Sequence, residues 1–321
     1  MTNNIKYEWP YKGSKLINKQ DLKPFLKRSN IDGLFHLSLH FLLILFTGTV
    51  LFFSLGTYFQ YPIILFHGIF IAFLYAGLHE CIHKTAFKNR LLNEVVGHFI
   101  GFILLRSFLN GRYRHMAHHT FTQHPDKDPD IVNFPKNYLE YIKHITSLTI
   151  WWRLLDNIVR HIFGFLNKQE KEYIPKSEIN NLIKESRIMM LGYFFIFSIS
   201  IYYSSYIFLI YWIIPRIIGE PFLRLIRMVE HTGKEESANM IKNTRTSHAS
   251  NFLKFIYWNM PFHVEHHLYA NVPFYRLKKF HKFIKPHTSE FEPSILSVHV
   301  EILKQIWINK KNNKKKNLLK I

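Results

Sequence analysis

Residues 63–83 read IILFHGIFIAFLYAGLHECIH, an apolar run that leads directly into two histidines, His79 and His83. A longer uncharged run, residues 34–55, comes before it, and only residues 56–62 separate the two. At about 1.5 Å per residue, a helix of about 20 apolar residues crosses a hydrocarbon core of about 30 Å. The two runs therefore predict a helical hairpin in a membrane, with both histidines at the end of its second helix.

A second hairpin is expected later in the chain. Residues 188–203 and 206–218 are apolar, with a short turn between them and Pro215 as the expected kink. Residues 95–105 are apolar but too short to cross a membrane, which indicates a re-entrant or interfacial helix. Residues 140–166 mix aromatic and basic side chains, which is typical of a surface helix. We expect an all-α integral membrane protein, with four transmembrane helices in two hairpins and a cytosolic helical cap that holds a histidine-ligated dimetal site.

The charge distribution predicts how the hairpins are oriented. The 321-residue chain carries 42 Lys and Arg against 22 Asp and Glu, a formal net charge of +20. Residues 56–62 and 203–206, which connect the helices of each hairpin, contain no Lys or Arg, so the positive-inside rule places both termini in the cytoplasm. Because the basic residues flank the apolar runs rather than forming one stripe, no nucleic-acid partner is expected.

These features predict three regions in a multi-pass protein, with the bacterial inner membrane as the expected location. The regions are a cytosolic N-terminal tail (1–31), a membrane domain (32–290) and a basic cytosolic C-terminal tail (291–321).

Eight histidines fall into three clusters, HECIH at 79–83, HMAHH at 115–119 and HVEHH at 263–267. Positions i, i+3 and i+4 of a helix share one face, so each cluster directs its imidazoles toward a common point. Neutral imidazole is the commonest metal ligand in proteins. Eight ligands are too many for one zinc ion, which takes about four, but they suit two transition-metal ions held close together.

The three clusters resemble the HxxxH, HxxHH and HxxHH boxes of the membrane fatty acid desaturase family. The stretch WNMPFHVEHHLYANVPFYRL (258–277), together with EHTG (230–233) and HPDKDPD (124–130), is similar to bacterial acyl-lipid desaturases. The resemblance covers most of the chain. It implies two iron ions, dioxygen as cosubstrate and a ninth ligand just after the last membrane helix. His231 occupies that place and is the expected ligand, with His248 as the alternative.

The resemblance thus implies no catalytic residue beyond the metal ligands and no other cofactor-binding residue. The expected ligands are His79, His83, His115, His118, His119, His231, His263, His266 and His267.

The function implied by the resemblance is an O2-dependent diiron oxidoreductase that introduces a double bond into the acyl chain of a fatty acid or lipid. Desaturation removes two neighbouring hydrogens, whereas hydroxylation removes one and returns oxygen, so a lipid or carotenoid hydroxylase or ketolase stays open as the alternative. A histidine-rich metal transporter is a more remote alternative. It would need ionisable residues inside its membrane helices, and the clusters lie outside the predicted ones.

The resemblance to desaturases also concerns the electron donor and the molecule that carries the acyl group. No HPGG haem motif flanks the boxes, so electrons are expected from a separate donor, a ferredoxin or a cytochrome b5-like protein. The acyl group sits on a lipid, on CoA or on a carrier protein, and the sequence leaves this choice open, together with chain length and double-bond position. A hydrocarbon tunnel is expected between the membrane helices, and its candidate walls are Phe66, Phe70, Phe73 and Tyr75.

Ligating imidazoles usually donate their second N–H to a carboxylate, a carbonyl or water. Glu265 lies two positions after His263, so it is expected to face away from the metals. Other histidines are expected outside the ligand set. Among them, His36 and His40 at the start of the first membrane helix are interfacial or packed, and His124 is a candidate partner of a ligand. The carboxylates closest to the boxes in sequence are Glu80, Asp126, Asp128, Asp130, Glu230 and Glu265.

Overall fold

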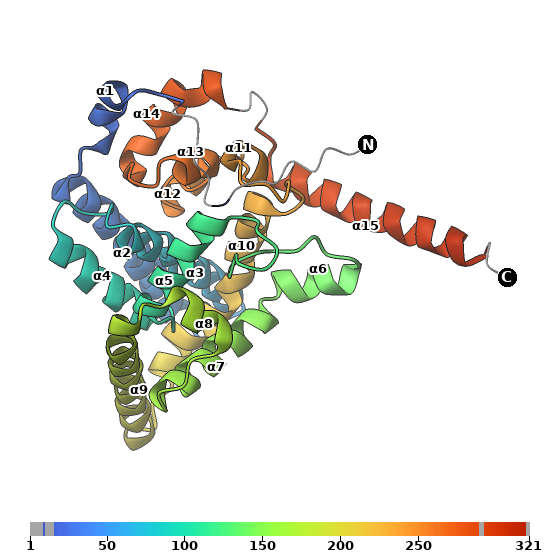
Figure 1. Cartoon of the computed structure of the whole chain (residues 1–321). Coiled ribbons are helices and arrows are strands. Elements are labelled where there is room, and N and C mark those ends of the chain that lie inside the picture. Colours follow the sequence, from blue (N-terminus) through green and yellow to red (C-terminus); the bar gives the residue numbers. More distant parts are fainter. Residues whose placement is uncertain (1–8, 10–15, 289–291, 319–321) are drawn as a thin grey trace, which may run out of the picture.

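The computed structural model describes Trp9, residues 16–288 and residues 292–318. Every regular element in this part of the chain is a helix, and an isolated β-bridge joins His248 to Ser294. The predicted all-α class is therefore confirmed for the described residues (Figure 1).

Helices α2 (Asn30–Ser54) and α3 (Gln60–Ile82) form the first predicted hairpin. Both are long and apolar enough to cross a membrane. The Ser29 hydroxyl caps α2 by accepting a hydrogen bond of 3.2 Å from the backbone N–H of Asp32. Gly56, with φ of 79°, allows the turn between the two helices. Residues 70–82 of α3 are all buried, so the end of this helix lies inside the protein.

Helix α10 (Ile214–His231) crosses α3 at two glycines. A Cβ at Gly68 would lie 2.1 Å from the carbonyl oxygen of Pro215, and a Cβ at Gly219 would lie 2.0 Å from the carbonyl oxygen of Gly68. Only glycine fits at these two positions. From the crossing, α3 runs about 16 Å to His79 and α10 runs about 18 Å to His231, at 1.5 Å per residue. The close crossing therefore brings both helix ends to the same region.

Helices α4 (Arg90–Ile103) and α5 (Phe108–Phe121) are bent by 104° at the break between them. Leu105 has φ of 58° and provides the change of direction. The short apolar segment at 95–105 falls on α4, and the bent pair forms either a broken membrane span or a re-entrant segment. The described residues thus contain two helices that could span a membrane, or three spans if the bent pair counts as one.

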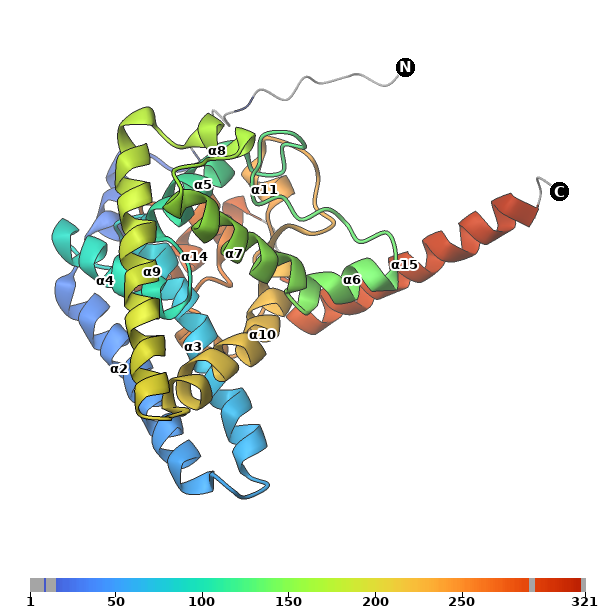
Figure 2. The same ribbon diagram turned by 90° about the horizontal axis from the view of Figure 1, so that it is seen from below.

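The second predicted hairpin is helical, but its bounds differ from the expectation. Helix α9 (Ile179–Tyr202) begins before the predicted span, and a π-helical turn, η3 (Leu209–Ile213), leads into α10. The predicted end at residue 218 is wrong, because α10 continues to His231. Figure 2 shows the turn after α9 and the turn between α2 and α3 at the same end of the molecule. Neither α9 nor α10 is apolar enough to count as a membrane span by composition, so the four crossings stay a prediction.

The surface helix expected at 140–166 forms two elements, α6 (Tyr138–Ile145) and α7 (Leu148–Ile162). Helix α7 is amphipathic, since Ile150 and Ile158 are buried while Trp152 is 74% exposed. It packs against α9. The shorter elements are α1 (Lys19–Leu22), η1 (Lys23–Leu26), α8 (Lys168–Tyr173), η2 (Lys176–Glu178) and η4 (Lys285–His287).

Four helices after α10 gather at one side of the molecule, at the top of Figure 1. They are α11 (Met240–Asn243), α12 (Asn251–Ile256), α13 (His263–Leu268) and α14 (Phe274–Ile284). The expected C-terminal tail contains a long helix, α15 (Ile295–Leu318), whose end extends away from the rest of the chain.

Candidate metal centre

The structure brings all nine predicted histidines together from four helices. Most of them lie in the last two turns of a helix, at its C-cap or on a short helix, and His115 lies near the middle of α5. Helix α3 and its C-cap supply His79 and His83, α5 supplies His115, His118 and His119, α10 ends at His231, and α13 supplies His263, His266 and His267.

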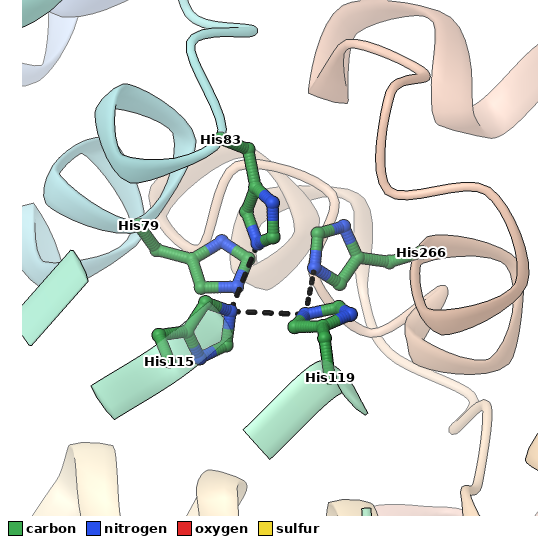
Figure 3. A group of neighbouring side chains, drawn as sticks. All are labelled: His79, His83, His115, His119 and His266. Atoms are coloured by element: carbon green, nitrogen blue, oxygen red, sulfur yellow. Dashed lines mark hydrogen bonds between the residues drawn. The ribbon is translucent and has the colours of Figure 1, made fainter. Parts of the chain in front are cut away.

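Five of these histidines form a first group (Figure 3). One ring nitrogen of each lies within 4.8 Å of the others. Nε2 of His115 lies 2.9 Å from Nε2 of His83 and 3.0 Å from Nε2 of His119. The members are His79, His83, His115, His119 and His266.

The other four histidines form a second group. Nε2 of His263 lies 3.2 Å from Nε2 of His231 and 3.2 Å from Nε2 of His267. His118 completes the group, since its nitrogen lies within 4.8 Å of those of His231 and His267. A carboxylate, Glu230, stands beside it, with Oε2 3.5 Å from Nε2 of His263.

The two groups are in contact. The rings of His119 and His267 stack at a centroid distance of 4.2 Å and an interplanar angle of 11°. Two adjacent sets of nitrogen donors suit two metal ions better than one, because a single ion cannot use nine ligands. Imidazole suits iron, zinc and copper alike, so the donor set fits a dimetal centre without selecting the element.

The hydrogen bonding of these side chains fits metal binding. Both ring nitrogens of His79 are buried without a hydrogen-bond partner among the described residues. Buried polar atoms are normally paired, and a metal ion would use such free lone pairs. Burial first, and then the neighbouring imidazoles, lower the pKa of His266 and His267 well below 6.5. The two rings are therefore neutral at pH 7, which is the form that binds metal.

Three of the rings are oriented by hydrogen bonds at Nδ1. Asp128 accepts from Nδ1 of His118, with its two carboxylate oxygens at 2.9 and 3.0 Å. Nδ1 of His231 lies 3.1 Å from the backbone carbonyl of Asn243. These contacts direct Nε2 toward the centre, as expected for metal ligands. Nδ1 of His267 similarly lies 3.3 Å from the Thr122 hydroxyl.

Some of the predicted carboxylate partners lie beside box histidines, and others do not. Asp128 is confirmed as a partner of a box histidine, and Glu230 and Glu80 lie close to box histidines, Glu80 with Oε1 3.8 Å from Nδ1 of His79. Asp130 instead pairs with Arg114 at 2.8 Å. Asp126 is exposed.

Glu265 faces away from the nitrogen groups, as predicted. Its Oε1 lies 2.6 Å from Nδ1 of His281, and the hydroxyl of Thr246 donates to Oε2 at 2.5 Å.

The histidines expected outside the ligand set lie outside it. The His40 ring is buried between the Phe70 carbonyl, 2.9 Å from Nε2, and the indole of Trp258, which donates to Nδ1 at 3.1 Å. His36 lies 2.9 Å from the carbonyl of Phe255. His248, the alternative ninth ligand, is exposed and is in none of the groups that could hold a metal.

Several supporting residues were not identified from the sequence. Thr122, Gln123 and Asn243 link separate segments: the Gln123 amide donates to the carbonyl of His231 at 2.9 Å, and the Asn243 amide donates to the carbonyl of Thr122 at 3.2 Å. Because these contacts join residues more than a hundred positions apart, only the folded chain reveals them. Thr122 could have been noticed as the residue three positions after the second box.

Comparisons with known proteins agree with this geometry. A family described as fatty acid desaturase matches residues 56–298. The chain is 22% identical over 253 residues, 74% of its length and 70% of the relative's, to an sn-1 acyl-lipid omega-3 desaturase (ferredoxin) of Nostoc sp. (strain 36). It is 24% identical to a Delta(12)-oleate desaturase of Trichosanthes kirilowii, over 76% of this chain and 72% of that one.

A third relative, a dihydrorhizobitoxine desaturase of Bradyrhizobium elkanii, is 26% identical over 84% of this chain and 79% of its own. All three relatives are named desaturases, which favours desaturation over hydroxylation or ketolation. Since the family match covers most of the chain and includes all three histidine boxes, the protein is a membrane enzyme of the fatty acid desaturase family, which introduces double bonds into acyl chains.

Proposed function

We propose that the nine histidines hold two iron ions and that the enzyme uses dioxygen to desaturate an acyl chain. The observation that supports this most directly is the contact between a group of five and a group of four imidazoles, each with nitrogens directed inward. When bound, a diiron centre supplies the oxidising power to remove hydrogen from an unactivated methylene, which no side chain can do.

The residues of this chain then have two tasks. The first is to hold the ligands in place, which Asp128, Asn243 and Thr122 do through Nδ1 of three histidines. The second is to exclude water. The space beside the histidines is a cavity of only about 10 Å³, and Tyr75 and Met260 are among the residues that line it. A space of this size holds at most about one water molecule.

The hydrocarbon chain is proposed to enter from the membrane side. A cavity of about 590 Å³ lies between α9 and the segment that ends in η3, and apolar side chains such as Phe197 and Trp212 line it. The expected walls on α3 have different roles: Phe70 and Phe73 are packed in the core, Phe66 is 53% exposed, and Tyr75 borders the histidine cavity.

The membrane arrangement is part of the proposal. We propose four crossings, by α2, α3, α9 and the segment from η3 into α10, with both tails and the metal centre in the cytoplasm of a bacterial cell. The absence of Lys and Arg from residues 56–62 and 203–206 supports this orientation. The exposed apolar face of α9, with Leu191 and Phe195 among its residues, supports contact with lipid.

Electrons are proposed to come from a separate carrier of the ferredoxin or cytochrome b5 type. The name of the Nostoc relative includes ferredoxin, and no HPGG motif flanks the histidine boxes of this chain. The acyl group is proposed to be part of a lipid, as in the names of the acyl-lipid relatives.

The test is expression of the full chain in an aerobic host, followed by elemental analysis and lipid profiling. Two iron atoms per chain and a new double bond in an acyl lipid are expected. One metal per chain, or a hydroxylated product with no new double bond, would contradict the proposal. His248→Ala serves as the matched control for His119→Ala, because His248 is exposed and stands apart from both groups.

A further inference from the structure

Glu230 is a buried carboxylate that lies directly beside the second group of histidines. It stands on α10, one position before His231, and the residue is 5% exposed. Its Oε2 lies 3.5 Å from Nε2 of His263, and that nitrogen lies 3.2 Å from Nε2 of His231. One donor atom from each of the three residues lies within 4.8 Å of the others. The carboxylate therefore shares the space into which the histidine nitrogens point.

The distances around His263 match those between ligands of a single ion. Nitrogen and oxygen donors lie about 2.0–2.2 Å from zinc, so two donors on one such ion stand roughly 3 to 3.5 Å apart. From Nε2 of His263 the distances are 3.2 Å to Nε2 of His231, 3.2 Å to Nε2 of His267 and 3.5 Å to Oε2 of Glu230. An imidazole nitrogen that binds an ion carries no proton, so in the loaded centre Oε2 cannot accept a hydrogen bond from Nε2 of His263.

The other contacts of Glu230 hold the carboxylate in place and leave Oε2 available. The hydroxyl of Tyr257, a buried side chain, donates to Oε1 at 2.7 Å. Nε of Arg227 lies 4.0 Å from Oε2, which is beyond hydrogen-bond length. Among the described residues, Oε2 thus has no hydrogen-bond donor. Carboxylates that bind metals are usually hydrogen-bonded in turn, and Tyr257 fills that role here.

The composition of the two histidine groups leaves a place for this carboxylate. The first group offers five nitrogens and the second offers four, so Glu230 would give each ion five protein donors. Among the described residues, Glu230 is the only carboxylate in the three sets of side chains that could hold a metal. It also lines the small cavity beside the histidines, together with members of both groups, namely His79, His115, His118 and His263.

We propose that Glu230 is a tenth ligand of the centre and binds the ion of the second group through Oε2, while Tyr257 holds its other oxygen. This inference rests on the proposed diiron function and deepens it, because it adds an anionic donor to one of the two ions. By Coulomb's law, a negative ligand stabilises an oxidised ion more than a reduced one. The two ions therefore differ in reduction potential, and the ion beside Glu230 is the easier one to oxidise.

The first test is removal of iron by a chelator from the purified, iron-loaded full-length protein in detergent. Glu230→Gln keeps the shape of the side chain but removes its charge. Loss of a group that only orients a ligand costs about 10–100-fold in metal affinity, and loss of a ligand should cost at least as much. One of the two irons should therefore leave at a chelator concentration lower by about tenfold or more, while the other leaves as in the wild type.

Glu235→Gln is the matched control for the chelation experiment. It removes the same charge at an exposed position only five residues along the chain. Its nearest charged partner is Lys242, at 3.6 Å, rather than any histidine of the centre. Both irons should leave this variant as they leave the wild type.

Mössbauer spectra of the same iron-loaded preparations separate a ligand from a residue with a structural role only. The two ions should give two quadrupole doublets. Glu230→Gln should change one of them, and Asp128→Asn should change the same one, because Asp128 orients His118 of the second group. Tyr257→Phe keeps the carboxylate and should keep both irons. It removes the hydrogen bond at Oε1, so it should shift that doublet by a smaller amount.

Chelation curves and spectra of Glu230→Gln that match the wild type would overturn the tenth ligand. Equal changes in both doublets would overturn it as well, because a general disturbance of the centre acts on both ions. If Glu230→Gln does not fold, unchanged doublets in Tyr257→Phe are the contrary result. A wild-type protein with fewer than two irons refutes the diiron proposal itself. Two irons in the wild type, with Glu230→Gln indistinguishable from it, refute the tenth ligand alone.

Discussion

Gly68 and Gly219 touch through their backbones: a Cβ on Gly219 would stand 2.0 Å from the carbonyl oxygen of Gly68. This contact sets the distance between α3 and α10. It therefore also sets how closely the two helix ends that carry His79 and His231 approach each other. Any larger side chain here has to push the two helices apart, and the histidines at their ends move with them.

Gly219→Ala should therefore lower both stability and metal content. Overpacking of a tight contact costs roughly 1–3 kcal/mol, which a thermal unfolding scan in detergent detects as a lower midpoint. Gly48→Ala on α2 is the control, since its new Cβ would meet its nearest neighbour, on His67, at 3.4 Å. If both variants melt like the wild type and retain metal, the crossing is looser than the structure indicates.

His119→Ala should abolish product formation and reduce bound iron. His119 belongs to the first group and also stacks on His267 of the second, so its loss disturbs both. His248→Ala should keep most of both signals. Lipid profiles and elemental analysis at matched expression give the comparison, and equal losses in the two variants would mean that the histidines are wrongly sorted.

Asp128→Asn should weaken metal binding without unfolding the protein. The substitution keeps the size of the side chain but removes the charge beside Nδ1 of His118. Loss of such a partner typically costs about 10–100-fold in metal affinity or activity. Competition with a chelator measures the change, with Asp126→Asn at an exposed neighbouring position as the control. Identical chelation curves would remove Asp128 from the support of the site.

Because of Glu170, the stability of the fold should decrease at acidic pH. Burial by itself raises its pKa, but hydrogen bonds from His161 and Arg160 outweigh it and lower the pKa from 4.5 to about 2. A carboxyl with a depressed folded-state pKa contributes stability above its unfolded pKa and loses it as pH falls through the folded value. The contribution should therefore be complete above about pH 4.5 and fade toward pH 2. Unfolding midpoints of Glu170→Gln should be lower at neutral pH and change less across that window; parallel pH curves for the two proteins would contradict this.

The topology predicts that the connection between α2 and α3 lies outside the cytoplasm. A reporter fused at residue 59 and one fused after residue 321 should report opposite sides of the membrane. The expectation depends on the absence of Lys and Arg from residues 56–62. The same side for both reporters would break the hairpin arrangement.

The sequence predicted the site better than the membrane helices. The spacing within HECIH, HMAHH and HVEHH is a local, periodic signal, and the convergence of these histidines follows from chemistry that needs all of them. His231 was identifiable only by resemblance, because a single histidine has no pattern of its own.

The end of α10, the last of the predicted membrane helices, could not be predicted from composition. Residues 206–218 were predicted as an apolar span, yet α10 continues to His231, and Arg216 near the end of that segment and Glu220 beyond it are both buried inside the protein. Their charges are satisfied by one another and by Arg106, which comes from the break between α4 and α5, more than a hundred residues away. A hydropathy pattern counts such residues as exposed because it cannot see partners that are distant in sequence.

Helix α13, which contributes His263, His266 and His267, has only six residues. An isolated helix of this length is unstable in water, since nucleation is unfavourable and few backbone hydrogen bonds follow. Its conformation depends on its packing against neighbouring helices, and a metal ion bound to its three histidines, as proposed, would stabilise it further. The third histidine box, on α13, therefore completes the proposed metal centre. Hydrogen exchange after chelation should show α13 opening first, so that the enzyme reports loss of its metal by local unfolding before the membrane helices respond.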